Sequence, residues 1–456
     1  MSGFGARNVQ LERRGEWVFE QIVETGSVVI KTIGGDRAGE IGAHRFLEAQ
    51  DVSVGSICNH FAERTAVACA NQRIVVAQDT TEINFAGRDK ARTGLGPAGA
   101  AGSTVGFFMH AGIAIDVASE ALLGLATLQI WTRDDCPASD RRKRTLEDKE
   151  SYRWLETGNA AADVLGGAQQ IIMVADREGD IYSHFARHRP QVDLIVRVAQ
   201  NRNTLSDDET TMGLFARLDE LAPLGTDTVD VIPRRIGEKP RTATVAIRAG
   251  RFRLARPHNG ASRDDPAAFE INVVEAREID AAGVREPLLW RLVTTLPVAT
   301  LAEANDVVGL YRLRWRIEEV FRVLKADGVK LEDSQMQGAG KLFKLAALAL
   351  AAAVRIIQLR DARDGSPRPA SDVIEADDVA AVEMIGKTLE GRTKRQQNHH
   401  QAGSLAWLAW IVARLGGWNC YYKPPGPKTM AAGWKKLATM LTAIKIATDA
   451  QQDMKV

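Results

Sequence analysis

Four polar residues recur at helical spacing in one segment of the chain. Residues 301–325 are mostly helix-forming, and a helix turns by about 100° per residue, so Tyr311, Arg314, Glu318 and Lys325 would share one narrow stripe. Apolar residues fill the neighbouring arc and would anchor the helix in a core. A carboxylate flanked by two cations and a phenol on one edge of a buried helix suits an anionic, metal-bound substrate.

Two aspartates each follow an apolar run that predicts a buried strand. Residues 73–79 end in Asp79, and residues 170–176 end in Asp176. Sites in open α/β sheets lie beyond the carboxyl ends of parallel strands, so both acids would reach one edge if the strands are neighbours. Each acid also has a simpler interpretation, as the cap of a turn or of the next helix.

The three acids together predict a two-metal site. Taken alone, Glu318 is also explained as a surface partner of Arg314, four residues earlier. The joint occurrence of Asp79, Asp176 and Glu318 is harder to explain in that way. Two divalent ions about 3.5–4 Å apart activate a weak nucleophile and stabilise a leaving oxyanion in phosphodiester hydrolysis. Hard Mg²⁺ prefers carboxylate oxygens, so we expect two Mg²⁺ ions, or Mn²⁺ in their place. Without metal, repulsion should raise the pKa of some of these acids.

The elements around these residues predict an α/β fold, with a mixed sheet flanked by helices. The expected order is strands at 73–79, 105–116 and 121–131, a helix at 146–165, a strand at 170–176, a helix at 181–187 and a strand at 193–198. Further helices are expected at 16–24, 37–49, 341–360, 405–415 and from 431 onward, with a strand at 287–295.

Residues 199–287 differ from the segments on either side. Alternation at 242–254, a turn at Gly250 and the cations Arg251, Arg253 and Arg256 predict a small β-rich insertion with a basic face.

Composition limits the class of protein. A length of 456 residues predicts two to four domains. The net charge of +1 gives no support to a nucleic-acid partner, so that inference depends on where the charges sit. The four cysteines show neither metal-ligand spacing nor a disulfide framework, which fits a reducing cytoplasm. No apolar signal core opens the chain, and the longest apolar stretch, residues 345–354, is too short to span a bilayer.

At this point a resemblance becomes specific. The pattern Tyr-x2-Arg-x3-Glu-x6-Lys, starting at Tyr311, is similar to the signature of the DDE transposases of the insertion-sequence-four family. Asp79 in Gln-Asp-Thr-Thr and Asp176 in Asp-Arg-Glu-x-Asp-Ile resemble that family's two catalytic aspartate contexts. Further similarity runs through most of the chain.

The resemblance implies an architecture and an activity. The fold would be a ribonuclease-H-like mixed-sheet core with a β-rich insertion, flanked by helical terminal domains. The implied domains are 1–54 for recognition of DNA ends, 55–198 with 288–362 as catalytic core, 199–287 as insertion and 363–456 for dimerisation. The implied activity is cut-and-paste transposition through a hairpin intermediate. The partners would be double-stranded DNA, both transposon terminal repeats and target, and a second copy of the chain in a synaptic complex. No membrane partner is expected, and the protein would be bacterial, cytoplasmic and nucleoid-associated.

The resemblance also assigns residues. Asp79, Asp176 and Glu318 would be catalytic and bind metal. The implied DNA contacts are Tyr311, Arg314, Lys325, Arg177, Arg197 and Arg45, with Trp290 stacking on a flipped base. From the residues alone, each arginine is equally a solvated surface charge, and a tryptophan in an apolar strand is more often part of a core.

Departures from the family leave two alternatives open. The N-terminal region is shorter than the family's, and Ala199 stands where a DNA-contacting lysine is expected. One alternative is a ribonuclease-H-like nuclease without strand transfer. The other is a DNA-binding regulator that poisons a full-length transposase through its C-terminal helices, although retention of all three acids argues against it.

Overall fold

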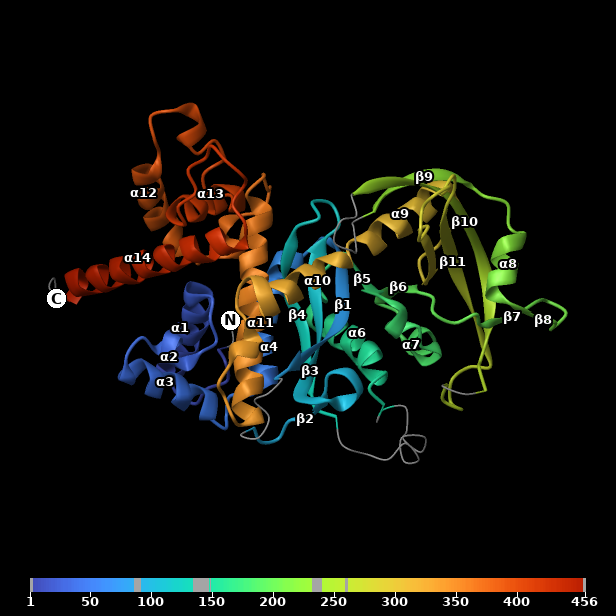
Figure 1. The fold of residues 1–456 in the computed structure, drawn as a ribbon, viewed down its shortest axis with the longest axis horizontal. Helices are drawn as coiled ribbons and strands as arrows, with labels where there is room; N and C mark the ends of the chain where they lie inside the picture. The colour runs from blue at the N-terminus through green and yellow to red at the C-terminus, as the bar shows by residue number, and fades with distance from the viewer. Residues whose placement is uncertain are drawn as a thin grey trace.

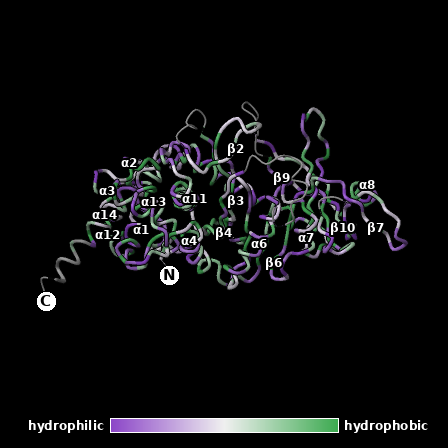
Figure 2. The backbone as a smooth tube through the Cα atoms, turned by 90° about the horizontal axis from the view of Figure 1, so that it is seen from below, coloured by the Kyte–Doolittle hydropathy of each residue, from purple (hydrophilic) through white to green (hydrophobic). Residues whose placement is uncertain are grey.

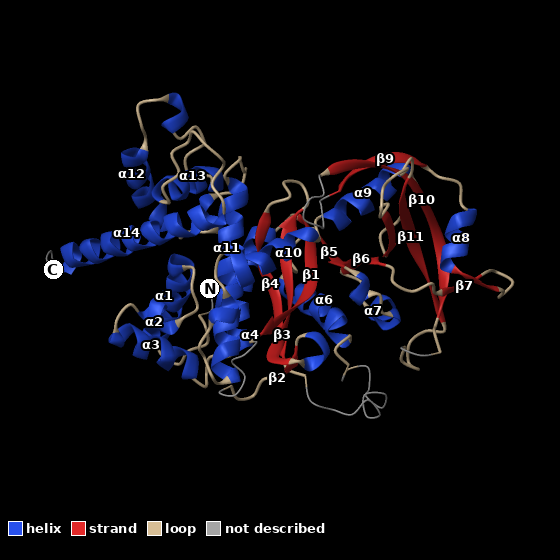
Figure 3. Ribbon diagram, viewed as in Figure 1, coloured by secondary structure: helices blue, strands red, loops and turns tan. Residues whose placement is uncertain are grey.

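The computed structural model describes residues 3–85, 92–133, 147, 149–231, 240–258 and 261–453. A central sheet lies between a helical part, formed by both ends of the chain, and the β-rich insertion on the other side (Figures 1 and 3). The N-terminal helices are α1 Val9–Thr25, α2 Ile30–Gly34, α3 Arg37–Glu48 and α4 Val54–Cys69. Side chains of Asn8, Asp36 and Ser53 accept backbone N–H bonds at the starts of α1, α3 and α4, and these caps fix where the helices begin.

The core sheet has the ribonuclease-H-like strand order implied by the resemblance. Its elements are β1 Arg73–Asn84, β2 Gly96–Ala98, β3 Thr104–Asp116, β4 Leu122–Trp131, α6 Tyr152–Val164, β5 Gln170–Ala175, α7 Tyr182–Arg187 and β6 Val192–Arg197. The strands lie side by side in the order β4-β3-β1-β5-β6; β1, β5 and β6 are parallel, and β3 is antiparallel to β1 and β4. The predicted helix at 146–165 starts at Tyr152, and residues 146 and 148 lie outside the described residues.

Alternate residues of the inner strands enter two separate cores. Val75 and Ala77 of β1 and Val174 of β5 lie in the core formed with α1, α10 and α11. Ile74 and Val76, one residue out of phase, lie in the core formed with α6 and α7. Both faces are therefore covered, as continuous apolar runs predict for parallel strands.

The insertion extends the core sheet. Its elements are β7 Asn203–Leu205, β8 Thr211–Gly213, α8 Leu214–Glu220, β9 Gly225–Val231, β10 Arg241–Ala255 and β11 Ala268–Glu278, followed by β12 Leu289–Thr294. β12 pairs with β6 on one side and β11 on the other, so a single sheet runs through both parts.

Two predictions about the insertion are wrong. Gly250 makes no turn: it lies inside β10, paired with Val273, and a Cβ there would be 2.9 Å from Leu221 Cδ1. The glycine serves close packing instead. The basic face is also largely neutralised, because Arg251 pairs with Glu270 and Arg253 with Glu209. The third cation, Arg256, donates to the backbone carbonyls of two nearby residues.

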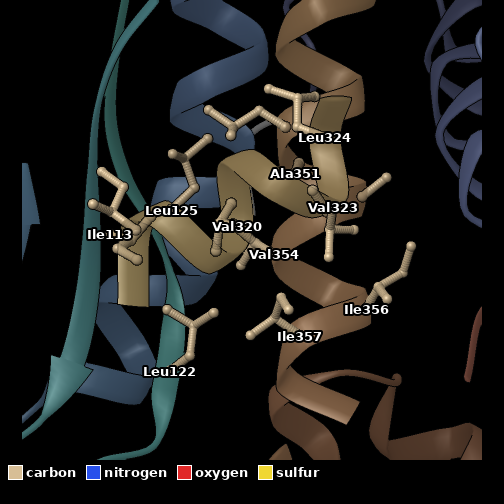
Figure 4. Packing of buried hydrophobic residues seen from close by; sticks show 14 of the residues in the cluster. Ile113, Leu122, Leu125, Val320, Val323, Leu324, Ala351, Val354, Ile356 and Ile357 are labelled. Carbon is tan, nitrogen blue, oxygen red and sulfur yellow. The ribbon is translucent and has the colours of Figure 1, made fainter. Parts of the chain in front are cut away.

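The predicted continuous helix at 301–325 is broken. Helix α9 covers Leu301–Arg312, α10 covers Trp315–Arg322, and one turn of π-helix covers Val323–Asp327. The signature residues therefore do not form one ideal helical stripe. Apolar residues of α10 and the π-turn, such as Val320 and Leu324, pack between β3, β4 and the long helix α11 (Figure 4).

The remaining helices are α11 Ala339–Ala362, α12 Val379–Leu389, α13 Leu405–Leu415 and α14 Pro427–Asp453. By length and composition α11 could cross a membrane, but 89% of its most apolar window is buried inside the protein, as in the core helix of a soluble protein. Much of the chain near α11, β3 and β4 is hydrophobic (Figure 2). α14 packs against α1 and α13, and the Trp434 indole donates to Glu20 Oε2 at 3.1 Å.

Candidate active site

Asp79 lies where the parallel pairing of β1 ends. The strand does not stop at this acid, as predicted, but continues to Asn84 alongside β3. Its parallel pairing with β5 ends at Ala77, two residues earlier. By alternation Asp79 shares a face with Val75 and Ala77, which is the face covered by α10 and α11.

Asp176 lies directly after β5. Ala77 pairs with Val174, so two more residues along each parallel strand bring the chain to Asp79 and Asp176. Asp176 has extended dihedral angles and caps a short 3₁₀ turn by accepting the Glu178 N–H at 2.8 Å. The capping interpretation is therefore confirmed, while the role of Asp176 in a metal site stays a prediction that its place at the sheet edge allows.

Glu318 is brought to the same place by α10. The chain turns at Leu313–Arg314, between α9 and α10, and α10 packs against β1. Arg314 Nη1 lies 3.2 Å from Asp79 Oδ2, and its Nη2 lies 2.9 Å from Glu318 Oε1. One guanidinium therefore joins a strand acid and a helix acid that are far apart in sequence.

The electrostatics of Asp79 reflect both of the other acids. Burial is the main cause that raises the pKa of Asp79 to about 7, and the charge of Asp176 raises it further. Arg314 opposes the rise, and Glu318 adds to it. Carboxyl groups whose pKa is raised by burial and by neighbouring acids are common at functional sites.

The donor set suits a hard divalent ion, but the side chains are not gathered around one. Carboxylate oxygens are the ligands that Mg²⁺ takes, and Asp79 and Glu318 share one arginine here, with Asp176 near Asp79. In the part of the chain that the structure describes, no group of three or more His, Cys, Asp or Glu side chains is placed to hold a metal ion. Asp176 and Glu318 both influence the pKa of Asp79, but the three side chains do not form a coordination shell.

Tyr311 and Trp290 are more buried than DNA-contacting roles would suggest. Tyr311 is 2% exposed, and burial raises its pKa. Trp290, on β12, is 7% exposed and packs edge-to-face on Tyr311, with ring centroids 5.2 Å apart at 69°. This fits the core interpretation of Trp290, so base stacking would require the ring to be uncovered and stays a prediction.

Three of the other cations predicted to contact DNA, Lys325, Arg197 and Arg177, come from different elements around the acids. Lys325, in the π-turn, donates from Nζ to the Glu82 backbone carbonyl of β1 at 2.9 Å. Arg197 ends β6, and its charge lowers the pKa of Tyr311, so it lies beside the signature residues. Arg177 is exposed next to Asp176.

Arg45 is not brought to the site. It is exposed in the last turn of α3, on the far side of α11 from β1 (Figure 1). Its predicted contact would have to be made with a different part of the DNA.

The sequence reasoning passed over a second charged group beside Asp176. Burial and the Asp176 charge raise the pKa of Glu178, and the nearby Arg133 opposes the rise. Arg133 itself forms two bonds of 2.8 Å to Glu150. The sequence does point to Glu178, because Glu178 is the glutamate of the Asp-Arg-Glu-x-Asp motif around Asp176, but no role was predicted for it.

Residues 156–355 match the family model described as Transposase DDE domain. The match contains Asp176 and the whole signature from Tyr311 to Lys325, but Asp79 lies outside it. It supports a DDE transposase, and therefore a nuclease and strand transferase that performs transposition by cleavage and joining of DNA. DDE transposases generally use divalent metal ions.

Proposed function

We propose that the chain is a cut-and-paste DNA transposase of the insertion-sequence-four family, close to the transposon-five transposase. It hydrolyses phosphodiesters at the ends of its own transposon with two Mg²⁺ ions, passes through a hairpin intermediate and joins the freed ends to target DNA. The DDE-domain match and the signature from Tyr311 to Lys325 support this proposal.

One observation supports the site most strongly. Asp79, Asp176 and Glu318 come from β1, the end of β5 and α10, and the pKa of Asp79 responds to both other acids. These three carboxylates would hold the metal ions. When bound, such ions activate the nucleophile and stabilise the leaving oxyanion.

The chain's own residues would position the DNA. Arg314 presents two N–H groups on one side of its guanidinium, a geometry that suits a phosphate. Lys325, half-buried beside Glu82, would add a point charge to the neighbouring phosphate. The buried phenol of Tyr311 would orient Arg314, with which it interacts in this structure.

The partners and domain roles belong to the same proposal. The helical region 1–54 would recognise transposon ends, and region 363–456 would join two copies in the synaptic complex. The long helix α14, which extends beyond the rest of the helical part, is suited to such a contact (Figure 1).

The test is incubation with DNA that carries the inverted repeats flanking the gene, in the presence of Mg²⁺. The wild type should cleave and join this DNA, and Asp79→Ala, Asp176→Ala and Glu318→Ala should do neither. Asp306→Ala is the matched control, because it removes a carboxylate of α9 that makes only a surface ion pair with Arg73. Activity retained in any of the three acid variants would refute the site.

The burial of Trp290 makes the hairpin step the part to test separately. Denaturing gels distinguish nicked, hairpin and joined products. Trp290→Phe, which keeps an aromatic ring against Tyr311, should nick normally and form fewer hairpins. Joined products without any hairpin would contradict the hairpin route, and cleavage without joining would favour a simple nuclease.

A further inference from the structure

Arg314 occupies the position between the acids that a cation is expected to take. Its side chain is 7% exposed, and it contacts Asp79 Oδ2 and Glu318 Oε1 with separate nitrogens. The side chains of Asp79 and Glu318 are 15% and 37% exposed, so the guanidinium is the most buried of the three groups. A buried guanidinium is retained only where acceptors compensate for its lost hydration.

The local fold places Arg314 there without satisfying it fully. Arg314 lies at the turn between α9 and α10, four residues and about one helical turn before Glu318. Its Nε is buried and has no hydrogen-bond partner among the described residues. Its guanidinium lies 4.9 Å from the centre of the Trp315 ring. One donor therefore remains for an acceptor that the described residues do not supply.

The same carboxylate oxygens serve two competing cations. Oxygens that accept N–H bonds from Arg314 are not available in the same geometry to a metal ion, and a guanidinium beside a divalent ion is repelled by it. A DNA phosphate offers the guanidinium a strong alternative, because arginine binds phosphate with two parallel N–H bonds. Moving Arg314 from carboxylates to phosphate keeps its charge compensated.

We propose, on the basis of the function proposed above, that Arg314 is an internal counter-ion that a DNA phosphate removes, which frees Asp79 and Glu318 for divalent metal. Metal binding and DNA binding are then coupled through one side chain. Such a coupling is reciprocal, so DNA strengthens metal binding by the same factor as metal strengthens DNA binding. The protein away from DNA holds a poorly assembled metal site, which limits nicking of the wrong DNA.

The experiment measures Mn²⁺ affinity of the full chain by titration calorimetry, without DNA and with a duplex of the inverted repeat. Wild type should bind Mn²⁺ roughly 5- to 150-fold more tightly with the duplex, the usual range of coupling between two sites. Arg314→Gln should bind Mn²⁺ more tightly than wild type without DNA and gain little from the duplex. Arg312→Gln is the matched control, because Arg312 is exposed two residues earlier, and it should behave as wild type.

The dependence of Mn²⁺ affinity on DNA distinguishes the counter-ion role of Arg314 from a simple repulsion between its charge and the metal ion. If Arg314 acted only through its charge, Arg314→Gln would strengthen metal binding equally with and without DNA, and that result would overturn the proposal. Circular dichroism checks folding of the variant. If Arg314→Gln does not fold, Arg314→Lys is measured in its place. An ammonium group is a single compact charge that does not bridge two carboxylates in the same way. Its coupling should be smaller than in wild type, and full coupling would overturn the proposal.

The two proposals fail in different ways. If Asp79→Ala and Glu318→Ala do not weaken Mn²⁺ binding to the wild-type complex, the proposed metal site itself is wrong. If both weaken it but Arg314→Gln leaves the coupling intact, only the counter-ion role is wrong.

Discussion

Two buried charge clusters in the same sheet are built in opposite ways. At the candidate site two acids, Asp79 and Glu318, share one arginine, Arg314, and a third acid, Asp176, lies near enough to raise the pKa of Asp79. In the insertion one acid, Glu275 on β11, is shared by three arginines from β10, β11 and β12: Arg248, Arg277 and Arg291. The Glu275 side chain is fully buried and its charge is fully matched within the chain.

The difference separates a structural cluster from a functional one. The Glu275 cluster ties three neighbouring strands together, and its arginines also contact α8 and the segment after it, through Asp219 and the Leu221 carbonyl. At the candidate site burial and the charge of Asp176 raise the pKa of Asp79, and Arg314 only partly offsets the rise, so the acids are not fully compensated within the chain. The following predictions test this contrast.

The largest expected effect is on catalysis. Asp176→Asn should lower the rate of strand cleavage by roughly 10³-fold or more, because loss of a metal ligand removes several kcal/mol of transition-state stabilisation. The measurement is single-turnover cleavage of inverted-repeat DNA. Glu275→Gln, assayed under conditions where it stays folded, should cleave at nearly the wild-type rate. Equal losses of cleavage rate in both variants would contradict the distinction between a functional and a structural cluster.

The next effect is on stability, and it should appear in the other cluster. Glu275→Gln leaves three arginines around a neutral side chain, so the free energy of unfolding should fall by about 3–5 kcal/mol, as when one partner of a buried pair is removed. Urea unfolding without metal measures this. Arg251→Gln, which breaks only the exposed pair with Glu270, should change it by less than about 1 kcal/mol. A stable Glu275→Gln variant would show that the cluster does not support the fold.

Asp79→Asn should do the opposite in metal-free protein. The folded pKa of Asp79, about 7, lies above its ordinary value of 3.8, so stability is greatest below pH 3.8 and is lost as the pH rises through 7. Above pH 7 the neutral asparagine should therefore raise the free energy of unfolding by up to about 4 kcal/mol, since one pKa unit corresponds to about 1.4 kcal/mol. Below pH 3.8 the two proteins should not differ. If Asp79→Asn is less stable than the wild type above pH 7, the raised pKa of Asp79 is contradicted.

The last prediction expects no change in Mn²⁺ affinity, and it tests whether the two faces of β1 are separate. His110, on β3, contacts Thr80 and Gln78, which point away from the Asp79 face. Burial lowers its pKa from 6.5 to about 3, so its contribution to stability is complete above pH 6.5 and is lost as the pH falls toward 3. His110→Gln should flatten the loss of stability in that range while leaving Mn²⁺ affinity unchanged. A changed Mn²⁺ affinity would mean that the two faces are not separate.

The apolar runs before Asp79 and Asp176 were enough to predict two buried strands. The sequence did not determine that Ala77 would pair with Val174, because register between distant strands depends on tertiary packing. That register is what brings the two aspartates together. The extension of β1 through Ile83 was signalled by alternating β-branched residues and was missed.

The errors arose where distant contacts override local preference. Nothing between Leu310 and Arg316 is a glycine or proline, so no local signal marks the break that lets Arg314 reach two acids. The basic face of the insertion was predicted from Arg251, Arg253 and Arg256, and the acidic partners of the first two come from other segments of the insertion. Charge patterning along one strand does not show which charges are already paired.

The central claim is that Asp79, Asp176 and Glu318 form one cation-holding centre once DNA has engaged Arg314. Anomalous diffraction from crystals of the protein–DNA complex soaked in Mn²⁺ tests it most directly. The account predicts Mn²⁺ peaks bound by oxygens of all three acids, with Arg314 on a phosphate. Peaks bound elsewhere, or Arg314 still bridging Asp79 and Glu318 beside bound DNA, would contradict it.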